Sequence, residues 1–447
     1  MTAIAPIPAF ARAARLPGAA ALLLLGGLLT GPALAAVDIQ RVVSPGGIEA
    51  WLVQENTLPM IAVSFAFRGG AAQDPADKPG VANLVSGLLD EGAGDLDSQA
   101  FQSLLDEYSI TLGFDAGRDS FTGRLKTLSE NRDEAFRLLG LAVTSPRFDT
   151  DAVERIRAQV AANIRGRDRD PESIASTAWM KAAFPDHPYG NPTEGTEASL
   201  AAVGVDDLKT FHANIFARAN LKIGVVGDID AATLGRLLDE TFGKLPAAPN
   251  LVPVTDVTTA IGARVDIEMA IPQTVIRFGG DGLARKDPDF IPAYVANHIL
   301  GGGDFSSRLY GEVREKRGLA YSIGTYLAPF DHGAVFAGGT ATRADRADES
   351  LALIESEIRR FATEGPTVDE VEKAKSYLIG SYPLRFDSSV EIAGQLLAIQ
   401  MDDLGIDYVN KRNDLIRAVT VEDVKRAAAR IFGADRLIVA RVGQPAT

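Results

Sequence analysis

An internal repeat restricts the fold of this 447-residue chain more than any other feature of its sequence. Residues 203–227 align with residues 419–443 without a gap. Each copy has the pattern of an amphipathic helix followed by a short β-branched strand that ends at glycine. The identities in register are Val203 with Val419, Asp207 with Asp423, Lys209 with Lys425, Phe216 with Phe432, and Gly227 with Gly443. The repeat therefore predicts two structurally equivalent halves.

The remaining predicted elements also recur in the same order in both halves. They are strands at 61–67 and 274–280, helices at 80–89 and 288–300, alternating strands at 111–128 and 320–342, and amphipathic helices at 131–141 and 347–363. A segment punctuated by proline, 245–253, separates the halves and has little capacity to be helical. Strands grouped together and followed by helices are typical of α+β proteins.

We therefore predict an α+β fold of two homologous α/β sandwich domains. The predicted boundaries are 37–245 for the first domain, 246–260 for a linker and 261–447 for the second domain. Each domain is expected to be a largely antiparallel sheet covered by helices. The two domains are expected to face one another across a cavity.

The first 36 residues have the pattern of a secretory signal peptide. Arg12 and Arg15 precede an apolar run at 18–29, and an Ala-Leu-Ala site follows at 33–35. We expect residues 1–36 to be removed on export, and the mature protein to be periplasmic; an uncleaved membrane anchor is the alternative. The chain has no cysteine, which excludes disulfides and thiolate metal sites. A large core makes such cross-links unnecessary in an exported bacterial protein.

The acidic charge of the chain disfavours some classes of binding partner. The formal net charge is −14 at pH 7. A strongly acidic surface repels phosphate backbones and anionic lipid headgroups, so we expect neither nucleic acid nor a membrane as a partner.

Four stretches carry a resemblance to a known family. They are 68–71 with 78–82, the Asp-His-Pro-Tyr segment at 186–200, the glycine-rich segment at 301–310, and Val-Arg-Glu-Lys-Arg-Gly-Leu-Ala-Tyr-Ser at 313–322. Together they resemble the pitrilysin-type (inverzincin, M16) zinc peptidases over nearly all of the mature sequence. The resemblance implies the LuxS/MPP-like metallohydrolase fold for each half.

The zinc motif of that family is degenerate in this sequence. The family motif His-x-x-Glu-His places two zinc ligands on one helical face with a general base between them, and a glutamate about 75 residues later completes the site. Alignment on Gly80 places Asn83, Ser86 and Gly87 at the three motif positions and Asn163 at the distant one. None of these side chains replaces the ligand or base it aligns with. We expect this chain to bind no cofactor and to be inactive alone.

The second half retains a pair that the resemblance makes functional. Family members carry an arginine and a tyrosine seven residues apart, and the matching residues here are Arg314 and Tyr321. The resemblance implies that they contact the substrate backbone and stabilise the oxyanion of the transition state, acting in trans on another subunit. On composition alone, Arg314 would belong to a solvated charged face and Tyr321 to the core.

These observations favour a non-catalytic partner subunit of a heterodimeric M16-type zinc metalloendopeptidase. The expected partner is a homologous subunit that carries His-x-x-Glu-His and the zinc, and the expected substrate is a peptide. Two alternatives stay open at this point: a structural scaffold with no role in proteolysis, and a peptide-binding module that acts alone.

Overall fold

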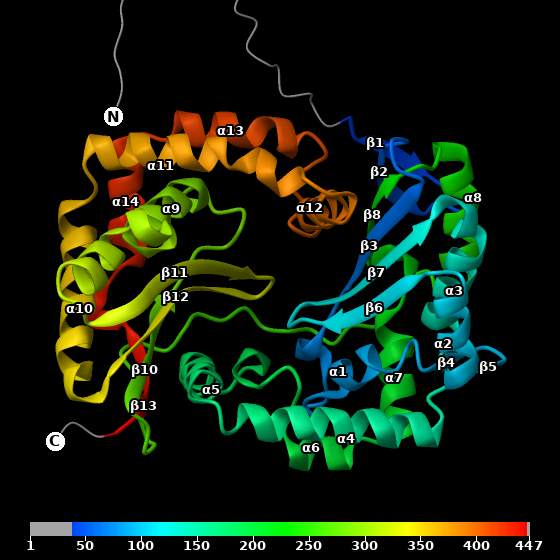
Figure 1. The fold of residues 1–447 in the computed structure, drawn as a ribbon, viewed down its shortest axis with the longest axis horizontal. Coiled ribbons are helices and arrows are strands. Elements are labelled where there is room, and N and C mark those ends of the chain that lie inside the picture. The colour runs from blue at the N-terminus through cyan, green and yellow to red at the C-terminus, as the bar shows by residue number, and fades with distance from the viewer. Residues whose placement is uncertain (1–37, 445–447) are drawn as a thin grey trace, which may run out of the picture. The chain divides into compact units, whose positions relative to one another are not determined.

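Two mixed β-sheets, each with helices against it, organise the chain (Figure 1). The computed structural model describes residues 38–444, so the predicted signal peptide lies outside the described residues. Among the described residues, no helix is both long enough and apolar enough to cross a membrane.

The six-stranded sheet belongs to the first half and the five-stranded sheet to the second. The strands of the larger sheet are β1 (Gln40–Val43), β2 (Glu49–Gln54), β3 (Met60–Arg68), β6 (Thr111–Ala116), β7 (Ser120–Leu128) and β8 (Leu221–Gly227). Those of the smaller sheet are β9 (Arg264–Glu268), β10 (Gln273–Asp281), β11 (Ala320–Phe330), β12 (Gly333–Arg343) and β13 (Ile438–Gly443). A short hairpin is made by β4 (Gly92–Ala93) and β5 (Leu96–Asp97).

The helices divide between the two halves in the same way. In the first half they are α1 (Val81–Ser86), α2 (Ser98–Glu107), α3 (Arg132–Thr144), α4 (Thr150–Arg167), α5 (Pro171–Ala183), α6 (Glu197–Ala202), α7 (Val205–Ile215) and α8 (Ala231–Phe242). In the second half they are α9 (Phe290–Asn297), α10 (Ala347–Glu364), α11 (Val368–Gly380), α12 (Ser389–Met401), α13 (Tyr408–Ala418) and α14 (Val421–Ile431).

The two sheets share one topology. The strand orders are β6-β7-β3-β8-β2-β1 and β11-β12-β10-β13-β9. Within each sheet, every neighbouring pair is antiparallel except β2 with β8 in the first and β13 with β9 in the second, which are parallel. The predicted α+β fold of two homologous halves is therefore confirmed.

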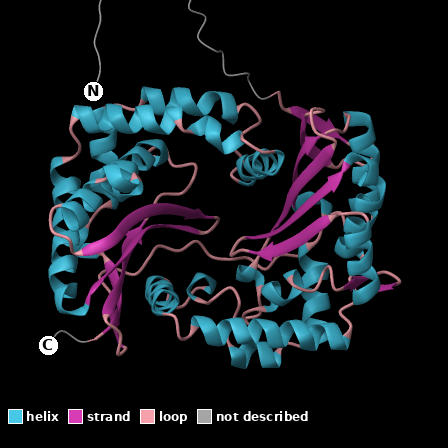
Figure 2. Cartoon of the chain, in the orientation of Figure 1, coloured by secondary structure: helices cyan, strands magenta, loops and turns pink. Residues whose placement is uncertain are grey.

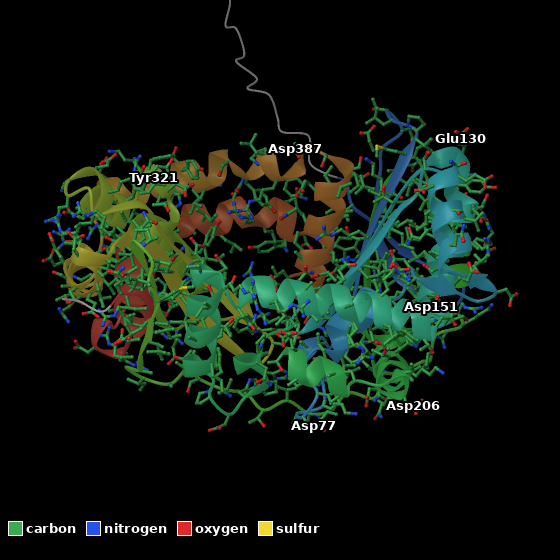
Figure 3. All side chains as sticks on the ribbon, turned by 60° about the horizontal axis from the view of Figure 1, so that its bottom comes forward. Asp77, Glu130, Asp151, Asp206, Tyr321 and Asp387 are labelled. Carbon is green, nitrogen blue, oxygen red and sulfur yellow. The ribbon has the colours of Figure 1, made fainter. Side chains whose placement is uncertain are left out.

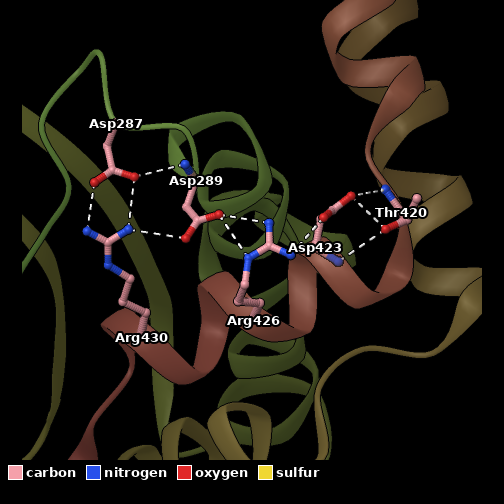
Figure 4. Close-up of polar contacts among 6 residues, drawn as sticks. All are labelled: Asp287, Asp289, Thr420, Asp423, Arg426 and Arg430. Carbon is pink, nitrogen blue, oxygen red and sulfur yellow. Dashed lines mark hydrogen bonds and ion pairs between the residues drawn. The ribbon is translucent and has the colours of Figure 1, made fainter.

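The aligned aspartates of the repeat, Asp207 and Asp423, form the same helix-capping hydrogen bond in both copies. Asp207 accepts a hydrogen bond from the Gly204 N–H at the start of α7 (2.7 Å), and Asp423 accepts one from the Thr420 N–H at the start of α14 (3.0 Å). Figure 4 shows how Asp423 also contacts Arg426, which reaches on to Asp289 in the turn before α9. Each aspartate satisfies an N-terminal N–H that the helix itself leaves unpaired.

The two aligned glycines are required by close strand approach. A side-chain carbon on Gly227 would lie 2.1 Å from the Met60 carbonyl oxygen, and one on Gly443 would lie 2.4 Å from the Thr274 hydroxyl. In both halves the end of the last strand thus meets the start of the sheet's central strand, and only glycine fits there.

Each half gives one helix to the sheet of the other half. Helix α5, capped by Asp170 and opened by Pro171, packs on β13 and β10 of the second sheet. Helix α12 packs on β8 and β3 of the first sheet. Figure 2 shows both helices against the magenta strands of these sheets. Trp179 of α5 is 3% exposed, and its indole N–H donates to the Ile438 carbonyl (3.0 Å).

Helix α12 is held against the first sheet by apolar contacts. Trp51 of β2, Ala62 of β3 and Val226 of β8 share a buried cluster with Leu396 and Ile399 of α12. The two largest core clusters each lie within one half, and smaller clusters around α5 and α12 combine residues of both halves. The domain boundaries at 37–245 and 261–447 stay a prediction.

A cavity of about 480 Å³ is lined by residues of both halves. Arg68, at the end of β3, crosses it and pairs with Asp331 (3.0 Å) and Asp403 (3.1 Å) of the second half. Lys286 also pairs with Asp403 (3.1 Å). The charged groups that line this cavity thus largely compensate one another.

Candidate functional site

Helix α1, where the resemblance places the positions of the zinc motif, is shorter than the predicted 80–89. It begins after Gly80, whose φ of 105° lies in the left-handed region, and it ends at Ser86. Asp74 caps it by accepting hydrogen bonds from the N–H groups of Gly80 (2.7 Å) and Ala82 (2.8 Å). Burial raises the pKa of Asp74 to about 7, although the backbone donors oppose that rise.

Two of the three predicted motif positions, Ser86 and Gly87, have structural roles. The Ser86 hydroxyl donates back to the Asn83 carbonyl (2.8 Å), as serines within helices often do. A side-chain carbon on Gly87 would lie 3.0 Å from Ile156 Cγ2 of α4, so an apolar side chain occupies the space that a histidine there would need. The zinc ligands of the family motif do not fit this place.

Helix α4 offers no replacement ligand. Asn163 is exposed, and the neighbouring Ile164 is buried in the same core cluster as Val81 and Leu84 of α1. Among residues 38–444, no group of three or more His, Asp or Glu side chains is arranged to hold a metal ion. The assignment of Asn163 to the distant position stays a prediction.

Restoring the motif in α1 should not restore a zinc site. We expect a variant with Asn83→His, Ser86→Glu and Gly87→His to retain no stoichiometric zinc after dialysis, because α4 supplies no third ligand. Overpacking against Ile156 should lower the free energy of unfolding by about 1–3 kcal/mol, measured by urea denaturation. Adding Ile156→Ala tests the steric part and should recover some of that loss. Tight stoichiometric zinc in the triple variant would contradict this account of the site.

The structure brings Arg314 and Tyr321 together. The Arg314 guanidinium carbon lies 5.5 Å from the Tyr321 ring centroid and 4.8 Å from that of Tyr310, whose hydroxyl accepts a hydrogen bond from Arg314. Tyr321 is 84% exposed, and Figure 3 labels it at the surface of the molecule. It is therefore not the core residue that composition alone would make it.

Arg314 also differs from the other charges of its segment. Lys316 and Arg317 both pair with Glu312 (2.6 Å each). Among the residues that the structure describes, no carboxylate lies within ion-pair distance of Arg314. The Arg314 guanidinium lies near the rings of Tyr310 and Tyr321 and donates one N–H to the Tyr310 hydroxyl, so its other N–H groups are available to an external acceptor.

The backbone that carries Arg314 is unusual. Residues Tyr310–Glu315 form a π-helical turn, and a second π-helical turn covers His298–Gly302. Such turns occur often at functional sites because they change the direction of side chains along a helix. Ser307 caps this segment by accepting from the Tyr310 N–H (3.4 Å).

The three glycines before this turn have a different role from the expected one. We expect positive φ at Gly301–Gly303 from the sequence, yet none of the three has it. A side-chain carbon on Gly301 would lie 2.6 Å from Thr325 Oγ1 of β11, and one on Gly302 2.6 Å from Asn297 Nδ2. Gly301 therefore allows close contact with β11, and Gly302 allows close contact with the end of α9.

Sequence reasoning missed Phe305, which extends the aromatic contacts of the pair. Phe305 is 74% exposed and packs edge-on against Tyr310, with ring centroids 5.0 Å apart. Phe305, Tyr310, Arg314 and Tyr321 thus form one contiguous group, which we call the Arg/Tyr surface. Phe305 and Tyr321 are exposed, whereas Tyr310 is buried at 5% exposure. An aromatic residue within a Gly/Ser-rich segment was the available signal.

A partly buried ion pair ties the segment before the π-helical turn to α11. Arg308 forms a two-pronged contact with Glu370 at the start of α11 (2.6 and 2.7 Å), and Glu370 also closes a capping box with Thr367. Burial acts to raise the pKa of Glu370. The hydrogen bonds from Arg308 and Thr367 outweigh it and lower the pKa from the ordinary 4.5 to about 2.

We expect Glu370→Gln to lower the free energy of unfolding by about 1–2 kcal/mol at pH 7, discounted for partial exposure of the pair. Because the folded-state pKa is depressed, this stability is present above pH 4.5 and is lost as the pH falls toward 2. Urea denaturation of both proteins between pH 7 and pH 3.5 should show the gap narrowing. Glu372→Gln, two residues along α11, is the control. A gap independent of pH would disprove this role of the Glu370 charge.

The Asp-His-Pro-Tyr segment proves to be structural. The His187 ring contacts the Thr255 carbonyl (3.0 Å). The buried Tyr189 hydroxyl donates to Asp119 (2.7 Å) and accepts from the His332 N–H (2.9 Å). The Tyr189 bonds join the first half to the β11–β12 hairpin turn.

Comparison with known proteins decides the family. Residues 51–197 match the family described as insulinase (peptidase family M16), and residues 202–378 match the one described as peptidase M16 inactive domain. A Helicobacter pylori protein named non-peptidase homolog YmxG is 30% identical over 343 residues, which are 74% of this chain and 77% of that protein. The chain belongs to peptidase family M16.

Further M16 relatives agree in length and fold. An uncharacterized zinc protease of Streptomyces coelicolor is 25% identical over 409 residues, 88% of this chain and 87% of that protein. The crystal structure of a peptidase M16 inactive domain from Pseudomonas fluorescens is 29% identical, with a TM-score of 0.86 over 92% of this chain and 98% of that one. The non-peptidase homologue and the inactive-domain matches group the chain with the inactive M16-family proteins, in agreement with the resemblance found in its sequence.

Proposed function

We propose that this M16 chain is the non-catalytic partner subunit of a heterodimeric zinc metallopeptidase. One observation carries the proposal: the Arg/Tyr surface is assembled and exposed in a chain whose α1 does not fit a zinc ion. A scaffold that only preserved the fold would have no need of an arginine without a carboxylate partner beside an exposed tyrosine.

In this proposal, Arg314 and Tyr321 act on a peptide held at the zinc of a homologous subunit. The zinc of the partner supplies the activated water. Arg314 donates hydrogen bonds to carbonyl groups of the peptide backbone and keeps its charge at every relevant pH. The Tyr321 hydroxyl donates to the carbonyl oxygen as that oxygen gains negative charge in the transition state.

The sheet edge of the first half suits an extended peptide. Strand β6 is at the edge of its sheet and pairs with β7 on one side only, among the described residues. An extended segment can add to such an edge through main-chain hydrogen bonds. Export to the periplasm, proposed from Arg12, Arg15 and the site at 33–35, would bring the pair to unfolded or exported peptides.

The test is a mixing experiment. Peptide hydrolysis is measured for this chain alone, for a homologous subunit with His-x-x-Glu-His alone, and for the mixture, with Arg314→Ala alongside. We expect only the mixture to cleave, and Arg314→Ala to slow it without preventing association. Equal activity of the homologue without this chain would overturn the proposal in favour of a scaffold.

A further inference from the structure

A second cavity, of about 480 Å³, lies in the C-terminal half between α9, β11, α12 and α13. Aromatic rings dominate its lining, and two apolar side chains of the α12 region, Ile399 and Leu404, add to it. The rings belong to Phe290, Tyr294, Tyr326, Tyr382 and Tyr408. Its volume and its apolar walls are those of a site for a small ligand or for one end of a chain.

Arg412, on α13, is a buried cation in the wall of this cavity. It is 7% exposed. Its Nη1 donates to the Leu378 carbonyl and to Asn413 Oδ1 (3.1 Å each), and its guanidinium carbon lies 4.1 Å from the Tyr382 ring centroid. No carboxylate among residues 38–444 lies within ion-pair distance of it. A buried guanidinium cannot lose its proton, so a missing counter-ion leaves it poorly compensated.

The cavity as a whole carries surplus positive charge. Its lining holds three arginines, Arg285, Arg385 and Arg412, and one carboxylate, Asp402. Asp402 already forms an ion pair with Arg285 (3.0 Å). Arg385 is exposed and has no ion pair within the part of the chain that the structure describes. Two cations therefore face an apolar cavity in a chain whose net charge is −14.

The other large cavities lack this surplus. The one crossed by Arg68 balances its cations with Asp331 and Asp403. A third, beside the start of α5, sets three arginines against three acidic residues, Asp170, Glu172 and Glu194. The cavity with Arg412 is thus the place where an anion with an apolar body would be bound best.

We propose that this cavity binds the C-terminal end of a peptide. Its α-carboxylate would accept hydrogen bonds from Arg412 and Arg385, and its last side chain, hydrophobic, would lie among the tyrosine rings. The planar guanidinium fork matches the two oxygens of a carboxylate. The half-buried amide of Gln395, which has no hydrogen bond to the described residues, faces the same cavity and can serve the peptide backbone. The inference rests on the proposed function only in taking a peptide as the ligand.

Two peptides that differ in one group test the proposal. The mature chain is titrated, without any zinc-bearing subunit, into an N-terminally fluorescein-labelled hexapeptide ending in Phe, as the free acid and as the C-terminal amide. We expect the acid to bind about 10- to 100-fold more tightly, as for a charge-assisted hydrogen bond. Arg412→Gln and Arg385→Gln should each weaken binding of the acid and reduce the difference between the two peptides. Arg417→Gln, an exposed position on the same helix that pairs with Asp414, is the matched control and should change neither affinity.

Arg385 keeps the test decisive even if Arg412→Gln fails to fold, because Arg385 is exposed and its replacement leaves the core intact. Equal affinity for acid and amide, or an unchanged preference in folded Arg385→Gln, would overturn the proposal. Tighter binding of a free fatty acid than of the peptide acid would overturn the choice of a peptide. Since no partner subunit enters the titration, a failure of heterodimer formation leaves its result unaffected.

Discussion

Tyr321→Phe should lower the peptide-hydrolysis rate of the mixture of this chain with its zinc-bearing homologue by about a hundred- to a thousandfold. The substitution removes one hydroxyl and keeps the ring. At 84% exposure the ring contributes little to the core, so stability and association should be unchanged. The loss should appear in kcat and in kcat/KM alike, because the hydroxyl acts on charge that develops only in the transition state.

The matched control for this prediction is Tyr377→Phe. Tyr377, on α11, is also exposed (59%), but it stacks on His298 and is separate from Arg314. Its hydroxyl should be dispensable for hydrolysis. If both tyrosines prove equally dispensable while the mixture is active, the Arg/Tyr surface has no part in the chemistry. A rise in KM alone for Tyr321→Phe would instead assign Tyr321 to substrate binding.

Trp179→Ala should lower the free energy of unfolding of the whole chain by about 3–5 kcal/mol. The indole is nearly fully buried against the second sheet, with its Cζ2 atom 2.8 Å from where a side-chain carbon on Gly279 would be. Its removal leaves a cavity and an unpaired Ile438 carbonyl. Because α5 belongs to the first half by connectivity but packs on the second sheet, the substitution should destabilise both halves.

The chain contains two tryptophans, and both lie where a helix crosses to the opposite sheet. In Trp179→Ala, fluorescence reports on Trp51 alone, at the crossing of α12. We expect its urea transition to coincide with that of circular dichroism and to move to lower urea than in the unmodified chain. Ser176→Ala on the same helix is the control, expected to change stability by at most about 0.5 kcal/mol. Two separate transitions would show that the halves unfold independently.

The division into two equivalent halves follows from features that are visible in the sequence. The gapless repeat that starts at Val203 and at Val419, with a glycine at each strand end, is a local pattern. The helix and strand that such a pattern predicts depend mainly on neighbouring residues. Asp207 and Asp423 each bond a backbone N–H three residues away, so their capping role follows from their place in the local sequence. The fold and the position of Arg314 near Tyr321 were predictable for this reason.

Long-range contacts were not predictable from the same patterns. Helix α12 is apolar almost all round, which indicates burial but not the sheet of the other half as its partner. Gly301–Gly303 indicated positive φ, whereas the structure uses them for close contacts with Thr325 of β11, with Asn297 and with His298. The exposure of Tyr321 depends on where β11 starts relative to the π-helical turn, and no local rule sets that. The cavity around Arg412 is formed by elements more than a hundred residues apart, so no motif marks it.

The exchange of α5 and α12 changes what the segment between the halves has to do. In a chain of two self-sufficient domains, such a segment keeps them together. Here each sheet is completed by a helix from the other half, an arrangement equivalent to a swapped dimer within one polypeptide. Once the chain is folded, residues 246–260 join parts that already hold each other. They contribute hydrogen bonds to both halves there, and in the unfolded chain they raise the concentration of each half around the other to the millimolar range typical of short tethers.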